Sequence, residues 1–201
     1  MHYEIIIQSL WCILPAYVAN ASALLVGGGL PLDFGKYWKD NRRILGNGKT
    51  WRGLFSGAFI GMTVGFGLSA AAKYINTTEF AWLGLNDFMG FPLMIPLIFS
   101  LCFGALLGDI TESFFKRRIG KKRGEDWLVF DQLDFIIGAL TFNILISTLL
   151  MVSGLAAFNW FFTSFSIWHI LVLLTFTPFF HLFANFVHRK AARKATPEKV
   201  K

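Results

Sequence analysis

Side chains that could do chemistry gather between residues 108 and 135. Four polar residues at helical spacing open this stretch: Asp109, Ser113, Lys116 and Arg117. If a helix continues through them, all four lie on roughly one face. Asp131 and Asp134 follow, three residues apart, and share a face at the start of the next apolar segment. The spacing therefore predicts that three carboxylates converge from two helix ends.

Oxygen ligands of this kind suit Mg²⁺, which typically takes one or two carboxylates together with substrate phosphate oxygens. Two such ions would clamp the attacking and leaving oxygens of a phosphoryl transfer. Lys116 and Arg117 could neutralise charge spread over the phosphate oxygens. The simpler alternative is that Asp131 and Asp134 only cap a helix N-terminus. Glu125 and Asp126 lie mid-loop, where exposure to solvent explains them.

A second stretch, residues 33–53, contains the sequence GNGKT. It is not a P-loop, because Arg43 stands where that motif needs glycine and no strand precedes it. Its glycines still allow backbone N–H groups to approach a phosphate. We expect Lys49 and Thr50 to contact the phosphates there.

The composition indicates that these segments lie on a membrane protein. The chain has 201 residues, 55% of them hydrophobic, and a mean hydropathy of +0.54. Charged residues make up 15%, whereas soluble domains carry about 25%. A spanning helix needs about 20 apolar residues. The chain offers five such segments: 5–26, 53–72, 92–108, 135–153 and 167–187. We predict an all-α, polytopic fold, with residues 1–201 forming one integral membrane domain.

Lysine and arginine are sorted along this topology. They concentrate in three segments, which we interpret as a first cytoplasmic loop, a second cytoplasmic loop and a basic cytoplasmic tail: 27–52, 109–134 and 188–201. Five spans put all three on one face, and the positive-inside rule makes that face cytoplasmic. The expected protein is therefore multi-pass in the cell membrane, with an external N-terminus. Acidic residues do not help orientation, so their presence among the basic ones, as at Asp33 and Asp40, suggests a site that holds both a polyanion and a metal ion.

Small residues recur at every fourth position of the second span: Gly53, Gly57, Gly61, Gly65 and Ser69. Such a stripe lets another helix backbone approach closely in lipid. Gly104 and Gly108 repeat the spacing in the third span. Asn20 and Asn143 lie at membrane depth and should face the bundle interior.

One motif in the chain resembles the signature of the CTP-dependent cytidylyltransferases that make CDP-lipids. It consists of Ser113, a basic cluster from Lys116 to Arg118, a spacer of twelve residues and then Asp131-Gln132-Leu133-Asp134. Bacterial and eukaryotic CDP-diacylglycerol synthases carry arginine where this chain has Gln132. The short chain and the upstream residues from Leu45 to Thr50 look like the archaeal branch, the CDP-archaeol synthases. The segment 40–43 lacks the glycine expected before arginine, and Asn47 stands where an acidic residue is commoner.

This resemblance implies transfer of CMP from CTP to a lipid phosphate, geranylgeranyl glycerol phosphate, with release of pyrophosphate and with Mg²⁺ as cofactor. Asp109, Ser113, Lys116, Asp131 and Asp134 would be catalytic, the three aspartates would bind metal, and Lys49, Thr50 and Arg117 would bind CTP. The expected partners are CTP, the lipid and the bilayer, without nucleic acid; a homo-oligomer stays open. The alternatives are a CDP-diacylglycerol synthase acting on phosphatidic acid and a membrane transporter, which would place charges nearer the bilayer midplane.

Overall fold

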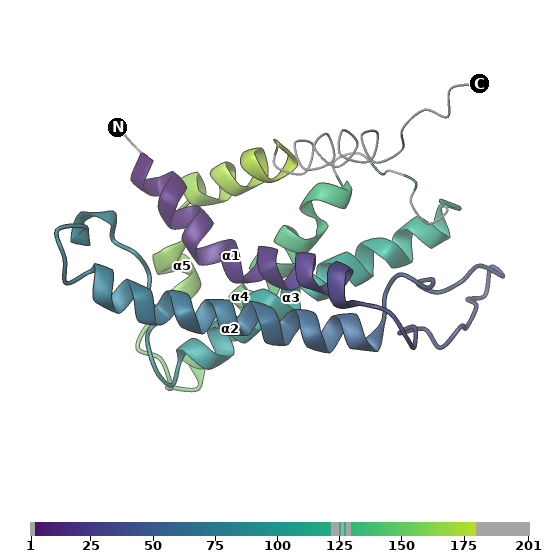
Figure 1. Ribbon diagram of the computed structural model, residues 1–201, viewed down its shortest axis with the longest axis horizontal. Coiled ribbons are helices and arrows are strands. Elements are labelled where there is room, and N and C mark those ends of the chain that lie inside the picture. The colour runs from purple at the N-terminus through teal and green to yellow at the C-terminus, as the bar shows by residue number, and fades with distance from the viewer. Residues whose placement is uncertain (1–2, 122–124, 126, 128–129, 180–201) are drawn as a thin grey trace, which may run out of the picture.

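The computed structural model describes residues 3–121, 125, 127 and 130–179. Within these residues the chain is helical, without a regular strand. The elements are α1 (Tyr3–Val26), α2 (Trp51–Ile75), the 3₁₀ helix η1 (Ala81–Leu83), α3 (Met94–Arg118), α4 (Phe130–Val152), α5 (Trp160–Ser164) and a further helix, Ile167–Phe179. The all-α expectation is confirmed (Figure 1).

Among the residues that the structure describes, four helices are long and apolar enough to cross a membrane: α1, α2, α3 and α4. The apolar helix Ile167–Phe179 falls in the predicted fifth span, whose residues 180–187 lie outside the described part of the chain, as does the basic tail. The third helix extends beyond the predicted span end at residue 108 and runs on to Arg118, so the polar residues spaced for a helix do lie on one. The charged motif of segment 109–134 therefore lies at the ends of two helices.

The glycine stripe of α2 packs as predicted. A Cβ at Gly57 would stand 2.7 Å from the carbonyl oxygen of Ala19, and one at Gly61 would meet the Ala19 side chain at the same distance. Farther along α2, a Cβ at Gly65 would collide with the side chain of Ile98 in α3. Because these positions carry no side chain, α2 lies against α1 for most of its length and against α3 beyond it.

Helices α3 and α4 come together in the same way. A Cβ at Gly108 would collide with the carbonyl oxygen of Asp134, and one at Gly104 would stand 2.7 Å from that of Gly138. Gly138 is itself in contact with Gly104 and Gly108, so glycine faces glycine where the helices cross. This crossing brings the backbone beside Asp109 next to the backbone of Asp134. It sets the predicted site residues of the two helices close together.

The molecule has two distinct ends. We call the basic end the first loop (residues 27–50), the last turns of α3 and the first turn of α4; the opposite end comprises residues 76–93 and 153–166. Figure 1 shows the first loop beside the end of α3, where Arg42 donates to the carbonyl of Arg118 at 2.5 Å. In between, Asn143 is fully buried and donates to Leu97 and Ser100, so it faces the bundle interior as predicted.

Candidate active site

A polar cavity of about 730 Å³ opens at the basic end between α1, the first loop, α3 and α4. Four carboxylates and three cationic side chains line it: Asp109, Glu112, Asp131, Asp134, Lys49, Lys116 and Arg117. Ser113, Thr50 and Asn20 line it as well. Every residue predicted to be catalytic or to bind CTP therefore faces one cavity.

Opposite charges in this cavity are already paired. The ammonium of Lys49 lies 2.5 Å from Oδ2 of Asp109, which joins the first loop to α3. Lys116 lies 2.6 Å from Oδ1 of Asp131 and 3.2 Å from Oε1 of Glu112, which joins α3 to α4. Helical spacing explains the second contact, since Glu112 and Lys116 are four residues apart on one helix. The cavity thus holds both signs of charge in a partly buried space.

Three buried polar atoms in the cavity wall have no aligned hydrogen-bond partner in the described part of the chain: Glu112 Oε1, Asp131 Oδ1 and Arg117 Nε. Lys116 stands at ion-pair distance from the two carboxylate oxygens, but without hydrogen-bond alignment. Two of these atoms are thus ion-paired without being fully hydrogen-bonded, so they keep the capacity to bind a ligand in the cavity. The described carboxylate, histidine and cysteine side chains nowhere converge in threes tightly enough to hold a metal by themselves.

The first loop is organised around one buried aspartate. Asp33 accepts hydrogen bonds from the guanidinium of Arg43 at 2.7 and 3.2 Å and from the backbone N–H groups of Gly35, Leu45 and Gly46. Burial alone would raise the pKa of this carboxyl group, but the hydrogen bonds from Arg43 and the backbone outweigh it and hold the pKa well below its usual range. Asp33 does not line the cavity, contrary to the interpretation that the loop carboxylates belong to the site.

Arg118 fastens this loop to α3. Its guanidinium pairs with Asp40 at 2.6 Å, donates to the carbonyl of Arg43 at 2.5 Å and lies over the rings of Trp38 and Phe114. The side chains of the basic cluster therefore point in two different directions. Lys116 and Arg117 face the cavity, whereas Arg118 holds the loop.

The glycine missing from the family pattern between residues 40 and 43 also has a structural explanation. Asn41 adopts a φ of 59°, the left-handed conformation that glycine favours and that asparagine tolerates better than most residues. Arg42 N–H donates to Oδ1 of Asp40, which closes the turn. Asparagine is therefore compatible with the backbone conformation of this turn.

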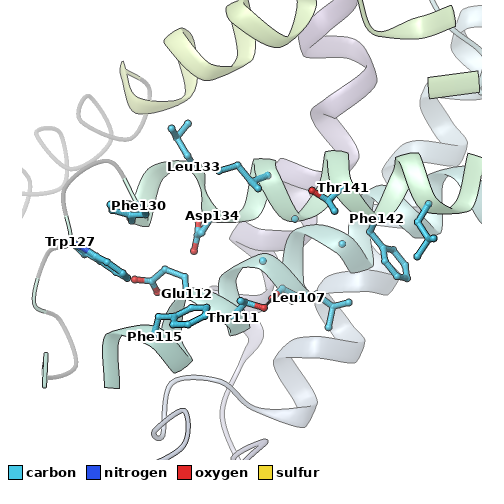
Figure 2. A pocket seen from close by; sticks show the side chains of 15 residues that line it. Leu107, Thr111, Glu112, Phe115, Trp127, Phe130, Leu133, Asp134, Thr141 and Phe142 are labelled. Carbon is cyan, nitrogen blue, oxygen red and sulfur yellow. Dashed lines mark hydrogen bonds between the residues drawn. The ribbon is translucent and has the colours of Figure 1, made fainter. Parts of the chain in front are cut away.

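A second hollow, of about 700 Å³, lies between α3 and α4 and is apolar. We call it the apolar groove. Its floor is the glycine crossing, and its walls include Leu107, Phe115, Phe130, Leu133, Ile137 and Phe142. Figure 2 shows Glu112 and Asp134 extending from the two helices into one end of this space, beside the rings of Trp127 and Phe130. The groove thus combines an apolar trough with a carboxylate end.

Glu112 and Asp134 line both hollows. They form a shared wall that separates a charged cavity from an apolar groove. Asp134 was predicted as a site residue, but Glu112 was noticed only as one of several nearby acids. Its spacing from Asp109 and Lys116 was the available signal, since three and four residues place it on the same helical face.

The remaining predicted residues fit less simply. Ser113 is buried in the cavity wall, as expected for a site residue. Thr50 is the N-cap of α2, and its hydroxyl oxygen accepts from the N–H groups of Gly28 and Gly53, both at 3.1 Å. Its part in CTP binding stays a prediction. Of the two mid-loop acids expected to be exposed, Glu125 is exposed and Asp126 lies outside the described residues.

Comparison with known proteins supplies a family for this geometry. A family model described as CarS-like, CDP-archaeol synthase, matches residues 2–197. The chain is 44% identical to the CDP-archaeol synthase of Thermococcus onnurineus over 98% of this chain and 99% of the relative. It is 37% identical to that of Methanocaldococcus jannaschii over 96% and 98% of the two chains.

A solved structure described as "Structural insight into an intramembrane enzyme for archaeal membrane lipids biosynthesis" aligns with a TM-score of 0.68 and 29% identity. The alignment covers 90% of this chain and 94% of the other. The match therefore extends over most of both chains. With a charged cavity and an apolar groove that meet at two carboxylates, and with relatives matching from end to end, this chain belongs to the CDP-archaeol synthases, membrane enzymes that transfer a cytidylyl group from CTP to a lipid.

Proposed function

We propose that the enzyme transfers CMP from CTP to geranylgeranyl glycerol phosphate, with CTP in the polar cavity and the lipid chains in the apolar groove. The observation that carries this assignment is the shared wall of Glu112 and Asp134. A substrate that is apolar at one end and phosphorylated at the other fits a groove that ends in charged residues. A triphosphate fits the cavity that offers Lys49, Lys116 and Arg117. The two phosphates then meet where the hollows meet.

In the proposed reaction, an oxygen of the lipid phosphate attacks the α-phosphorus of CTP, and pyrophosphate leaves with the electrons of the broken P–O bond. A phosphate monoester has a second pKa near 6, so it is largely ionised at neutral pH and needs no strong general base. The difficulty is to bring two polyanions together. Lys49, Lys116 and Arg117 serve this purpose by neutralising and orienting the phosphates. Each ion pair seen in the cavity then exchanges a carboxylate for a phosphate oxygen.

Mg²⁺ is part of the proposal. Asp109, Asp131 and Asp134 all line the polar cavity, and their carboxylate oxygens are suitable hard donors. Because Mg²⁺ commonly takes one or two carboxylates and completes its shell with phosphate and water, it does not require a preformed cluster of three. When bound there with CTP, the ion would stabilise the negative charge that develops on the phosphate oxygens.

We further propose that the basic end faces the cytoplasm, where CTP is available, since the lysine and arginine sorting orients it so. Lys121→Cys should resist labelling by an impermeant reagent in intact cells and react after permeabilisation. Labelling in intact cells would reverse the orientation.

The substrate assignment is tested by pyrophosphate release from CTP with purified protein and a panel of lipid phosphates, including phosphatidic acid. Filling the groove with Thr141→Trp should raise the KM for the lipid about tenfold and leave the KM for CTP unchanged. The matched control is Thr63→Trp, the same change at an exposed threonine of α2 away from both hollows. If both variants behave like the parent protein, the lipid chains do not lie in this groove.

A further inference from the structure

The first loop contains a carboxylate that the proposed chemistry does not use. The side chain of Asp33 is fully buried, and its two oxygens accept five hydrogen bonds: from Arg43 Nη2 and Nε and from the N–H groups of Gly35, Leu45 and Gly46. Both oxygens are thus committed. Asp33 lines neither the polar cavity nor the apolar groove, so it has no direct access to a substrate there.

What these bonds fix is the path of the chain into the cavity. Leu45 and Gly46, whose N–H groups are held by Asp33, are cavity residues themselves. Gly46 has a φ of 91°, which marks a sharp turn that side chains disfavour. Three residues later, Lys49 accepts a backbone hydrogen bond from Leu32 through its carbonyl and reaches Asp109 with its ammonium. The segment 45–49 is therefore held at one end by Asp33 and at the other by Leu32.

We propose that Asp33 is a positioning residue for the nucleotide: with Arg43 it forms a clasp that holds segment 45–49 in the conformation that receives the triphosphate of CTP. The assignment rests on the proposed function. Ordering a flexible, glycine-containing segment when the ligand binds costs conformational entropy and weakens affinity. A segment that is already ordered before binding avoids this cost. The clasp acts through Leu45, Gly46 and Lys49 and touches no reacting atom.

The clasp makes a prediction that a purely structural role does not. The apolar groove is formed by α3, α4 and Trp127, and no residue of the first loop lines it. Loosening the clasp should therefore weaken the binding of CTP and leave the binding of the lipid unchanged. General destabilisation of the protein would instead affect both substrates or the amount of folded enzyme.

The experiment measures KM for CTP, KM for the lipid phosphate, kcat and the melting temperature in one detergent for Asp33→Asn and Arg43→Lys. Arg43→Lys keeps the charge but loses the planar fork that binds both carboxylate oxygens, so it tests the clasp even if Asp33→Asn folds poorly. The matched control is Asp40→Asn, the same chemical change in the same loop, where Arg118 keeps its contact with the Arg43 carbonyl.

We expect both clasp variants to raise the KM for CTP at least tenfold, to change the KM for the lipid less than twofold, and Asp40→Asn to behave like the parent enzyme. An unchanged KM for CTP in both variants of an active enzyme overturns the positioning role alone, as does an equal rise in both KM values. A parent protein that does not consume CTP with any lipid phosphate overturns the proposed function, and the positioning role with it.

Discussion

The two ends of the helical bundle treat their polar side chains in opposite ways. At the opposite end, the side chain of Asn86 accepts a hydrogen bond from Trp160 Nε1 at 3.0 Å and donates one to Ser164 Oγ at 2.8 Å. The backbone carbonyl of Asn86 accepts a further hydrogen bond from Trp11 Nε1. Gln8 bonds to the carbonyl of Leu83 and to His169. Each of these side chains closes a contact between elements that are distant in sequence.

The basic end contains fully bonded groups such as Asp33, but it also contains buried polar atoms without an aligned hydrogen bond. In the described residues such side-chain atoms all lie at this end or in the adjoining first turn of α2: Trp51 Nε1, Glu112 Oε1, Arg117 Nε, Arg118 Nε and Asp131 Oδ1. Leaving buried polar groups unsatisfied costs free energy, and three of these atoms belong to residues that line the polar cavity: Glu112, Arg117 and Asp131. Polar side chains therefore join distant elements at the opposite end, whereas at the basic end some of them keep bonding capacity for a ligand.

The largest expected effect comes from the shared wall. Asp134→Asn removes a negative oxygen from the point where the two hollows meet, and turnover should fall about 10²–10³-fold or more while the protein still folds. Asp87→Asn makes the same change at the opposite end and should leave turnover within about twofold of the parent. Pyrophosphate release with Mg²⁺, CTP and lipid phosphate measures both. Near-normal activity of Asp134→Asn would reduce the aspartate pair to a helix cap.

The next effect tests the crossing that supports that wall. A Cβ at Gly138 would collide with the backbone of α3, so Gly138→Ala should destabilise the protein by about 1–3 kcal/mol. Gly67 in α2 has no neighbour within 4 Å of an added Cβ, and Gly67→Ala should stabilise by about 0.5–1 kcal/mol. Thermal unfolding in one detergent compares them. Equal melting temperatures would show that α3 and α4 do not depend on this contact.

A smaller effect is expected at the opposite end. Asn86→Ala leaves Trp160 and Ser164 without their partner and should lower stability by about 1–2 kcal/mol. Its kcat and both KM values should match the parent enzyme, because these bonds connect loops and touch neither hollow. A loss of kcat without a change in melting temperature would contradict the division between the two ends.

The smallest effect concerns pH. The pKa of Asp33 is lowered in the folded protein, whereas an unfolded aspartate has a pKa near 3.9. A group with a depressed pKa stabilises the fold above its unfolded pKa and loses that contribution as pH falls through the folded one. The difference in melting temperature between the parent and Asp33→Asn should thus be constant from about pH 5 to 8 and shrink only in stronger acid. A difference that changes between pH 6 and 8 would assign the effect to another group.

Much of the basic end was predictable because its residues follow local periodicities. Asp109, Ser113 and Lys116 share a helical face by spacing alone, and the structure places all three in one cavity. The recurrence of glycine at every fourth position of α2 likewise predicted close helix packing. Hydropathy alone ended the third span at residue 108, because polar residues from Asp109 onward interrupt the hydropathy pattern without interrupting the helix.

Local sequence specifies the apolar spans, the sorting of basic residues to one end and the order of the charged motif, because each depends on neighbours within a turn or on the length of an apolar run. The side-chain partners depend on the tertiary fold. Lys49 meets Asp109 across 60 positions, and Asp33 turns to Arg43 instead of the cavity. Such pairings depend on how closely helices cross and how an irregular loop folds back, and in this protein a bare glycine surface on α3 and α4 sets the crossing.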